Sequence, residues 1–259
     1  MALTLADPYD AREFLVQVAS TPAAPRAGLK TRLRLTVREP STRALVRDLV
    51  DVHEKPYHLF VISQDLEHYD HVHPVQRADG SYVVDVTLPK PGYYTLYSDF
   101  LPLGGRPQVV RTSMATAGFS GTLASQRARL VPDETLTRTV GGMRVTLTLP
   151  PDGLVAGRDD ALQYHIVDAH TAAPIADIEP YLAAFGHTLV LSDDTLHYVH
   201  AHAVELLPDD RTAALGGPDL TFKAMLPKPG RYRVWTQLKR RGLVSTVSFT
   251  VAVASPAER

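Results

Sequence analysis

Short stretches in which apolar and polar residues alternate with a period of two recur along the whole chain. The clearest of them span residues 32–37, 83–88, 143–149 and 244–251. Such alternation predicts β-strands with one face in a core and the other toward water. Turn sequences rich in proline and glycine separate the stretches, for example Lys90-Pro91-Gly92 and Lys228-Pro229-Gly230. The pattern therefore predicts an all-β fold of many short strands.

One histidine-rich stretch occurs twice. Residues 58–75 and 187–204 lie 129 positions apart and share 9 of 18 residues, four histidines among them. The same offset aligns Gly28 with Gly157, and a Leu-Pro-Lys-Pro-Gly-x-Tyr sequence begins at both Leu88 and Leu226. Solenoid repeats have periods of about 20–50 residues, so a repeat this long predicts two similar domains in tandem.

The predicted strands and turns are typical of β-sandwich domains of roughly 100 residues each. We expect the first sandwich in residues 1–122 and the second in residues 130–259, because the strand pattern breaks at residues 119–130. Tyr94 and Tyr232 each follow a proline-glycine turn. In that position they resemble the tyrosine corner of such sandwiches.

Composition narrows the classes of function. The formal net charge is −1, from 27 basic and 28 acidic side chains, which leaves no electrostatic footprint for nucleic acid. No apolar run approaches the roughly 20 residues of a transmembrane helix. The absence of cysteine excludes disulfides, thiolate metal sites and cysteine nucleophiles. The first residues lack the pattern of a signal peptide, so we expect either a cytoplasmic protein or one whose signal has been removed.

The repeated stretch is predicted to form a hairpin that gathers imidazoles on one face. If residues 63–66 form the loop, His58 faces His71 across the two strands. Opposed residues project to the same face, and His73, two positions from His71, joins them there. His68 would then lie on the other face or in the loop. A five-residue loop would instead turn His58 away from both.

Three convergent imidazoles suit zinc(II) or copper(II). Four scattered methionines and no thiol argue against copper(I). The first copy also offers Asp99, where the second has Gln237, so we expect the first site to bind a dication more tightly. The candidate ligands are His58, His68, His71, His73 and Asp99 in the first copy, and His187, His197, His200 and His202 in the second.

Two other readings of these histidines remain open. The chain can be a two-domain interaction or assembly module whose histidines only satisfy hydrogen bonds, with a protein partner that the sequence does not identify. It can also be a metalloenzyme, because three histidines and a water form a catalytic arrangement. No general base is positioned by the sequence, so the enzyme ranks last and non-enzymatic metal binding first.

The segment from Val52 to Pro74, with the Leu-Pro-Lys-Pro-Gly-x-Tyr sequence and residues 99–108, resembles bacterial exported β-sandwich proteins of the YtkA-like and CopC-like kind. These are associated with copper or heavy metals. The resemblance implies an immunoglobulin-like or cupredoxin-like fold, here duplicated in tandem, and a periplasmic or extracellular location. The second copy departs from the pattern at Ala203, which replaces a proline, and at Gln237.

Overall fold

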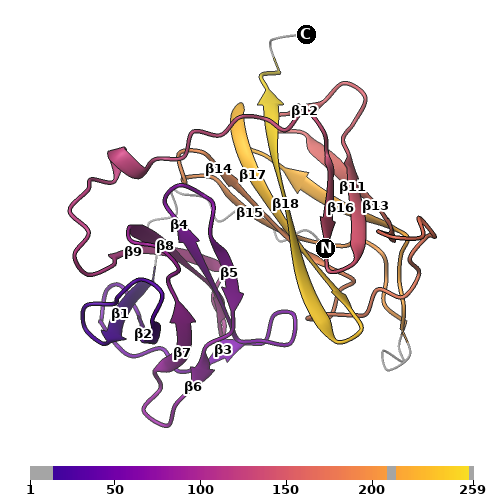
Figure 1. Ribbon diagram of the computed structural model, residues 1–259. Helices are drawn as coiled ribbons and strands as arrows, with labels where there is room; N and C mark the ends of the chain where they lie inside the picture. Colours follow the sequence, from indigo (N-terminus) through magenta and orange to yellow (C-terminus); the bar gives the residue numbers. More distant parts are fainter. Residues whose placement is uncertain (1–13, 209–213, 257–259) are drawn as a thin grey trace. The chain divides into compact units, whose positions relative to one another are not determined.

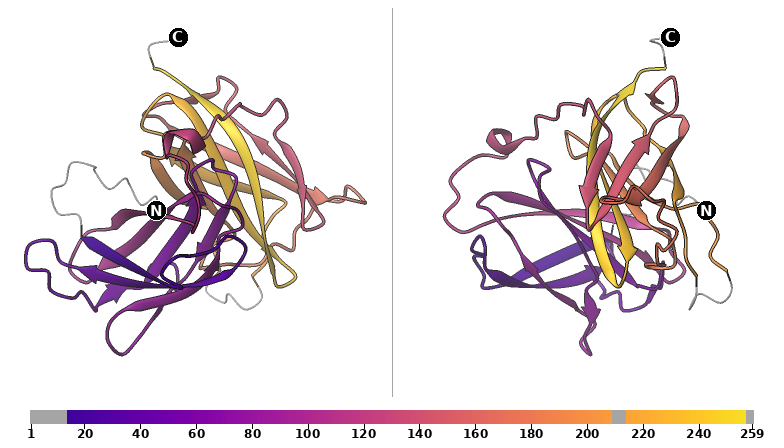
Figure 2. Two further views of the ribbon diagram at one scale, coloured as in Figure 1. Left: turned by 60° about the vertical axis from the view of Figure 1, so that its left-hand side comes forward. Right: turned by 45° about the vertical axis from the view of Figure 1, so that its right-hand side comes forward.

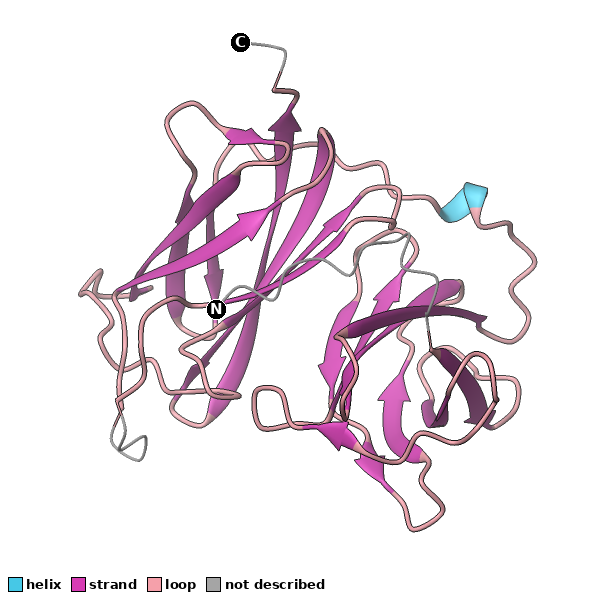
Figure 3. Cartoon of the chain, turned by 180° about the vertical axis from the view of Figure 1, so that it is seen from behind, coloured by secondary structure: helices cyan, strands magenta, loops and turns pink. Residues whose placement is uncertain are grey.

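A computed structural model describes residues 14–208 and 214–256 (Figure 1). The chain divides into two compact units between Ala128 and Arg129, hereafter domain one and domain two. A single 3-10 turn, η1 (Ala124–Gln126), is the one helical element of the described residues and is cyan in Figure 3. No described helix has the length and apolar character needed to cross a bilayer.

Domain one consists of two antiparallel sheets. The first has the order β1-β2-β7-β6 and comprises β1 (Leu15–Thr21), β2 (Lys30–Arg38), β7 (Tyr82–Thr87) and β6 (Val75–Gln76). The second has the order β3-β8-β4-β5, with β9 also paired to β8. Its strands are β3 (Leu49–Val50), β8 (Tyr93–Pro102), β4 (Tyr57–Ser63), β5 (Tyr69–Val72) and β9 (Gln108–Ala115).

Domain two also has two sheets, antiparallel except that the short β12 runs parallel to β18. One sheet has the order β10-β11-β13-β16, made of β10 (Thr137–Val140), β11 (Met143–Thr148), β13 (Asp159–Asp168) and β16 (Asp219–Met225). The other has the order β12-β18-β17-β14-β15. Its strands are β12 (Leu154–Val155), β18 (Leu243–Ala254), β17 (Gly230–Arg240), β14 (His187–Ser192) and β15 (Tyr198–His202). The long yellow strand in Figure 2 is β18.

The strand order is that of an immunoglobulin-like sandwich. In domain one, β1-β2-β7-β6 corresponds to strands A, B, E and D, and β9-β8-β4 corresponds to G, F and C. In domain two, β11-β13-β16 gives A, B and E, and β18-β17-β14 gives G, F and C. The predicted all-β fold of two tandem sandwiches is therefore confirmed.

The predicted tyrosine corners are present in both domains. The Tyr94 hydroxyl donates to the Lys90 carbonyl at 2.8 Å, and the Tyr232 hydroxyl donates to the Lys228 carbonyl at 2.8 Å. Each bond joins the start of a long strand to the turn before it. Both tyrosines are buried. These bonds tie the Pro-Gly turns to the sandwich, as the sequence predicted.

Alternation along the central strands determines which side chains enter the cores. Tyr57, Leu59 and Val61 of β4 belong to the core of domain one, as Val190 of β14 does in domain two. The intervening residues of β4 and β14 point to the opposite face of their sheets. His58 and His187 lie on that face, yet they are only 3% and 1% exposed. The histidines thus occupy buried positions outside the apolar cores.

Candidate metal centre

The hairpin register differs from the prediction by two residues. In domain one, Leu59 is opposed to Val72 and Phe60 to His71, so the expected pairing of His58 with His71 is wrong. Domain two has the same register, with His187 directly opposite His202. Because side chains alternate with period two, a shift of two residues leaves every side chain on its original face. The three imidazoles are therefore gathered as predicted, although the partners are exchanged.

The loop chemistry explains the shift. The Ser63 amide donates to the His68 carbonyl, and the His68 amide donates to the Ser63 hydroxyl oxygen. These bonds close the loop, so residues 64–67 form it instead of residues 63–66. Asp65 accepts hydrogen bonds from the Ser63 hydroxyl and the Glu67 amide, and Leu66 adopts a φ of 60°. Ser192, Asp194 and Thr195 make the corresponding arrangement in domain two. The shared Ser-x-Asp sequence was the signal that could have located the loop.

In domain one, one nitrogen from each of His58, His71 and His73 points to a common centre. The distance from His58 Nδ1 to His71 Nε2 is 3.0 Å, and that from His73 Nε2 to His71 Nε2 is 3.2 Å. Ligands of a tetrahedral zinc ion with bonds of about 2.0–2.1 Å lie about 3.3 Å apart. Two of the three nitrogen separations are thus close to the spacing that one shared ion requires, and the third is below 4.8 Å.

Domain two holds the same arrangement of His187, His200 and His202, with the candidate ligand atoms within 4.8 Å of one another. The rings of His187 and His202 meet at 83°, and those of His58 and His73 at 84°. The rings of His200 and His202 meet at 56°, and those of His71 and His73 meet at 59°. Ring orientation is therefore preserved although half of the hairpin sequence differs.

The other nitrogen of the β4 and β14 histidines is bound to the backbone. His58 Nε2 donates to the Val52 carbonyl at 2.8 Å, and His187 Nε2 donates to the Tyr181 carbonyl at 2.8 Å. A carbonyl only accepts, so Nε2 carries the proton and Nδ1 keeps its lone pair. Metal-binding histidines commonly donate their second nitrogen in this way. Neither carbonyl was predictable, because a backbone atom leaves no residue pattern in the sequence.

Each of these carbonyls begins a tight two-residue turn. His53 and Glu54 have φ values of 49° and 67°, and Leu182 and Ala183 have values of 52° and 57°. All four lie in the left-handed region, which costs about 1–2 kcal/mol for each residue other than glycine. The two turns are again 129 positions apart. His53 is thus part of the turn and outside the histidine cluster.

Burial favours the neutral form of two histidines of the first cluster, His58 and His73. It lowers the pKa of His58, against the opposing effects of the bond to Val52 and the charge of Asp99. It also lowers the pKa of His73 to about 3, helped by nearby His58 and Lys55. Metal ions bind neutral imidazole. At neutral pH these two rings are already in that form, so no imidazolium has to be deprotonated before an ion binds.

Asp99 lies directly opposite His58 on β8, and Gln237 lies directly opposite His187 on β17. Neither belongs to the cluster of convergent nitrogens, so the cluster consists of histidines alone. Asp99 acts on it through charge, because the carboxylate raises the pKa of His58. The two clusters therefore have the same ligands and differ in the charge of a neighbour.

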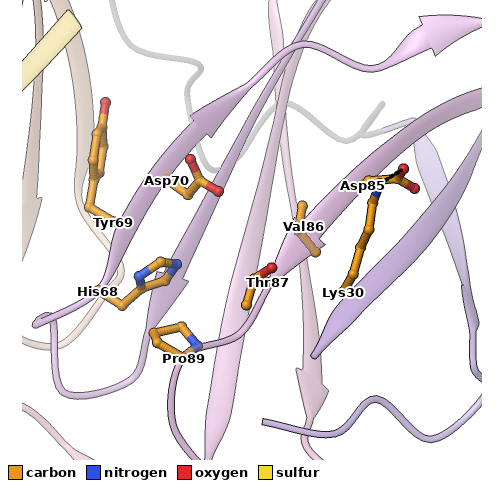
Figure 4. A pocket seen from close by; sticks show the side chains of 8 residues that line it. All are labelled: Lys30, His68, Tyr69, Asp70, Asp85, Val86, Thr87 and Pro89. Atoms are coloured by element: carbon orange, nitrogen blue, oxygen red, sulfur yellow. Dashed lines mark ion pairs between the residues drawn. The ribbon is translucent and has the colours of Figure 1, made fainter. Parts of the chain in front are cut away.

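His68 and His197 are not brought into the clusters. His68 pairs with Ser63 at the end of the hairpin and lies edge-on to the Tyr94 ring, whose centroid is 5.8 Å away. Figure 4 shows His68 and Asp70 on one side of an open cleft of about 560 Å³ that is lined on the other by Lys30 and Asp85. His197 holds the same hairpin position in domain two.

Solved structures similar to the chain include fibronectin(III)-like modules of Clostridium thermocellum CbhA, with 13% identity, a TM-score of 0.25, and coverage of 95% of this chain and 97% of that one. Domains 4 and 5 of the S-layer protein SbsC have 12% identity, a TM-score of 0.23, and coverage of 93% and 99%. The Yersinia pseudotuberculosis adhesin InvE has 13% identity, a TM-score of 0.26, and coverage of 92% and 60%. Similarity at this level says nothing about function.

No curated protein matches the chain. A family model does match it, and the match falls in two blocks. Residues 13–118 cover most of domain one, and residues 138–255 cover most of domain two. The chain therefore belongs to the family described as a domain of unknown function, DUF8832.

Proposed function

We propose that this protein binds divalent metal ions, zinc(II) or copper(II), with one ion in the three-histidine cluster of each domain. The observation that carries the proposal is the convergence of three ring nitrogens. His71 Nε2 lies 3.0 Å from His58 Nδ1 and 3.2 Å from His73 Nε2. Structural histidines bond mostly to the main chain or to water. Here the ring nitrogens bond to one another: in the metal-free protein these two contacts are hydrogen bonds, and an ion would take the place of the shared protons.

Three further features support the proposal. The backbone holds His58 and His187 in the tautomer whose Nδ1 carries a lone pair and no proton. Burial keeps the pKa of His73 near 3, so this ring is neutral at physiological pH. The same cluster occurs in a second domain whose hairpin sequence has diverged. The resemblance to YtkA-like and CopC-like proteins adds a role in copper or heavy-metal handling, outside the cytoplasm, to the proposal.

Equilibrium dialysis of the full chain against zinc(II) or copper(II), followed by elemental analysis, tests the proposal. We expect two tightly held ions per chain, one ion in the single variants His71→Ala or His200→Ala, and none in the double variant. Circular dichroism verifies that each variant is folded. Fewer than one ion on the folded wild-type chain would overturn the proposal and favour an assembly module with structural histidines.

A further inference from the structure

The turn at residues 52–55 and its counterpart at residues 181–184 have the same construction. In each, the first residue and the fourth exchange backbone hydrogen bonds, Val52 with Lys55 and Tyr181 with Ala184. Both central residues are left-handed, which is the geometry of a type I′ turn. That geometry favours asparagine and glycine, but the central residues here are His-Glu and Leu-Ala.

Each turn directs its first carbonyl at a histidine of the adjacent strand. The Val52 carbonyl accepts from the Lys55 amide at 3.3 Å and from His58 Nε2 at 2.8 Å. The Tyr181 carbonyl accepts from the Ala184 amide at 3.2 Å and from His187 Nε2 at 2.8 Å. Both lone pairs of each oxygen are thereby used. In domain two, His187 Nε2 also lies 3.2 Å from the Leu182 carbonyl, so its bond is shared between two oxygens of the turn. The central residues of the two turns differ, whereas the strained backbone and the bond from the histidine to the first carbonyl are common to both.

We propose that these two turns, His53–Glu54 and Leu182–Ala183, are ligand-positioning elements that make His58 and His187 bind metal through Nδ1. In domain one, His71 and His73 face the cluster with Nε2, so that site has one Nδ1 and two Nε2 ligands. Because the hairpin is repeated, we expect the same set of ligands from His187, His200 and His202. This inference rests on the proposed metal function. Without the carbonyl, the imidazole is able to exchange tautomers, and its Nδ1 carries a proton for part of the time.

Nuclear magnetic resonance of the full chain labelled with ¹⁵N-histidine tests the inference, because two-bond correlations distinguish the two ring nitrogens. With a chelator present, His58 and His187 are expected to be protonated at Nε2. On addition of zinc(II), the metal-induced shift should appear at Nδ1 of these two residues and at Nε2 of the other four. A proton on Nδ1 in the metal-free protein, or a zinc-bound Nε2 on His58, would overturn the inference.

The same titration separates failure of the inference from failure of the proposed function. Zinc bound through Nε2 of His58 or His187 contradicts the positioning role and leaves metal binding intact. If no histidine nitrogen responds to zinc or copper, metal binding itself is wrong, whatever tautomer the rings adopt.

Substitutions in the turn provide a second test. Proline cannot adopt a positive φ, so Glu54→Pro should break the turn and weaken zinc binding in domain one by about 10–100-fold. Glycine accepts a positive φ, so the control Glu54→Gly should bind as the wild type does. Ala183→Pro and Ala183→Gly form the matched pair in domain two. Full affinity in both proline variants, with the Nε2-protonated tautomer retained, would contradict the inference. If a proline variant does not fold, the wild-type spectra decide.

Discussion

His187 and His202 face each other across β14 and β15, with ring centroids 4.6 Å apart and ring planes at 83°. In domain one, Phe60 and His71 are likewise cross-strand neighbours, but their rings are stacked, with centroids 4.1 Å apart and planes at 13°. Cross-strand pairs of this kind each stabilise a sheet by roughly 0.2–1 kcal/mol. The candidate metal ligands are therefore held by the sheet itself, before any ion binds.

Binding of an ion to a pre-formed cluster should stabilise its domain. An ion present at 100 times its dissociation constant adds about 2.7 kcal/mol to the free energy of unfolding. In thermal denaturation, His202→Ala should abolish the zinc-induced stabilisation of domain two and preserve that of domain one. His197→Ala is the control, because His197 lies outside the cluster. Equal stabilisation of His202→Ala and the wild type would show that zinc binds elsewhere.

Asp99 in domain one and Gln237 in domain two, which lie opposite the clusters, should determine which site binds a divalent ion more tightly. Removing the charge in Asp99→Asn should weaken the first site by about tenfold, or about 1.4 kcal/mol, and Gln237→Asp should strengthen the second. Competition titration with a metal-binding dye measures both. Asp79→Asn, in a turn of domain one, is a charge-matched control that should change neither site. A wild-type chain whose sites bind equally would contradict this assignment.

Acid should destabilise the metal-free protein before it affects the surface carboxylates. The native pKa of His73 is about 3 because of burial, and the unfolded value is about 6.5, so the unfolded chain binds more protons between these limits. The free energy of unfolding therefore falls as the pH drops below about 6.5, by about 1–2 kcal/mol at pH 5 for His73. The raised pKa of Asp70 acts in the opposite sense at lower pH.

Denaturant titrations at pH 7, 6 and 5 with excess chelator measure this dependence. The variant His73→Gln should flatten the profile, because a neutral amide replaces the ring that must stay deprotonated in the folded protein. A profile in His73→Gln as steep as that of the wild type would assign the acid sensitivity to other groups.

The tyrosine corners should stabilise each sandwich independently. Tyr232→Phe removes the hydrogen bond to the Lys228 carbonyl and should lower the stability of domain two by about 1 kcal/mol. Tyr94→Phe should have the same effect on domain one, with metal affinity unchanged in both variants. Chemical denaturation followed domain by domain provides the measurement. A loss of metal binding in Tyr94→Phe, with stability unchanged, would mean that the tyrosine serves the site instead of the fold.

The alternation of side chains was sufficient to predict the strands and the shared face of His58, His71 and His73, and the proline-glycine turns were sufficient to predict the tyrosine corners. The register was not predicted correctly, because the loop depends on the side-chain bonds of Ser63 and Asp65. The error of two residues did not change the predicted face of any side chain, since only an odd shift moves side chains to the other face.

The remainder of the site could not be read from the sequence. The turn carbonyls depend on backbone torsions that His-Glu and Leu-Ala do not favour, so no turn-forming residue pointed to them. The pairing of Asp99 with His58 joins strands 41 positions apart in the sequence, and only the assembled sheet determines it. The burial of His58 on the face away from the core was likewise not predictable. Residues 59–62 are uniformly apolar, so the sequence does not show which face of this strand meets the core.

Anomalous diffraction from crystals of the full chain grown with zinc(II) or copper(II), measured on both sides of the metal's absorption edge, is the most direct test of metal binding. We predict one strong peak in each domain, about 2.0–2.1 Å from Nδ1 of His58 or His187 and from Nε2 of the two remaining histidines. Ordered electron density for all six rings with no anomalous peak between them would contradict metal binding by this protein.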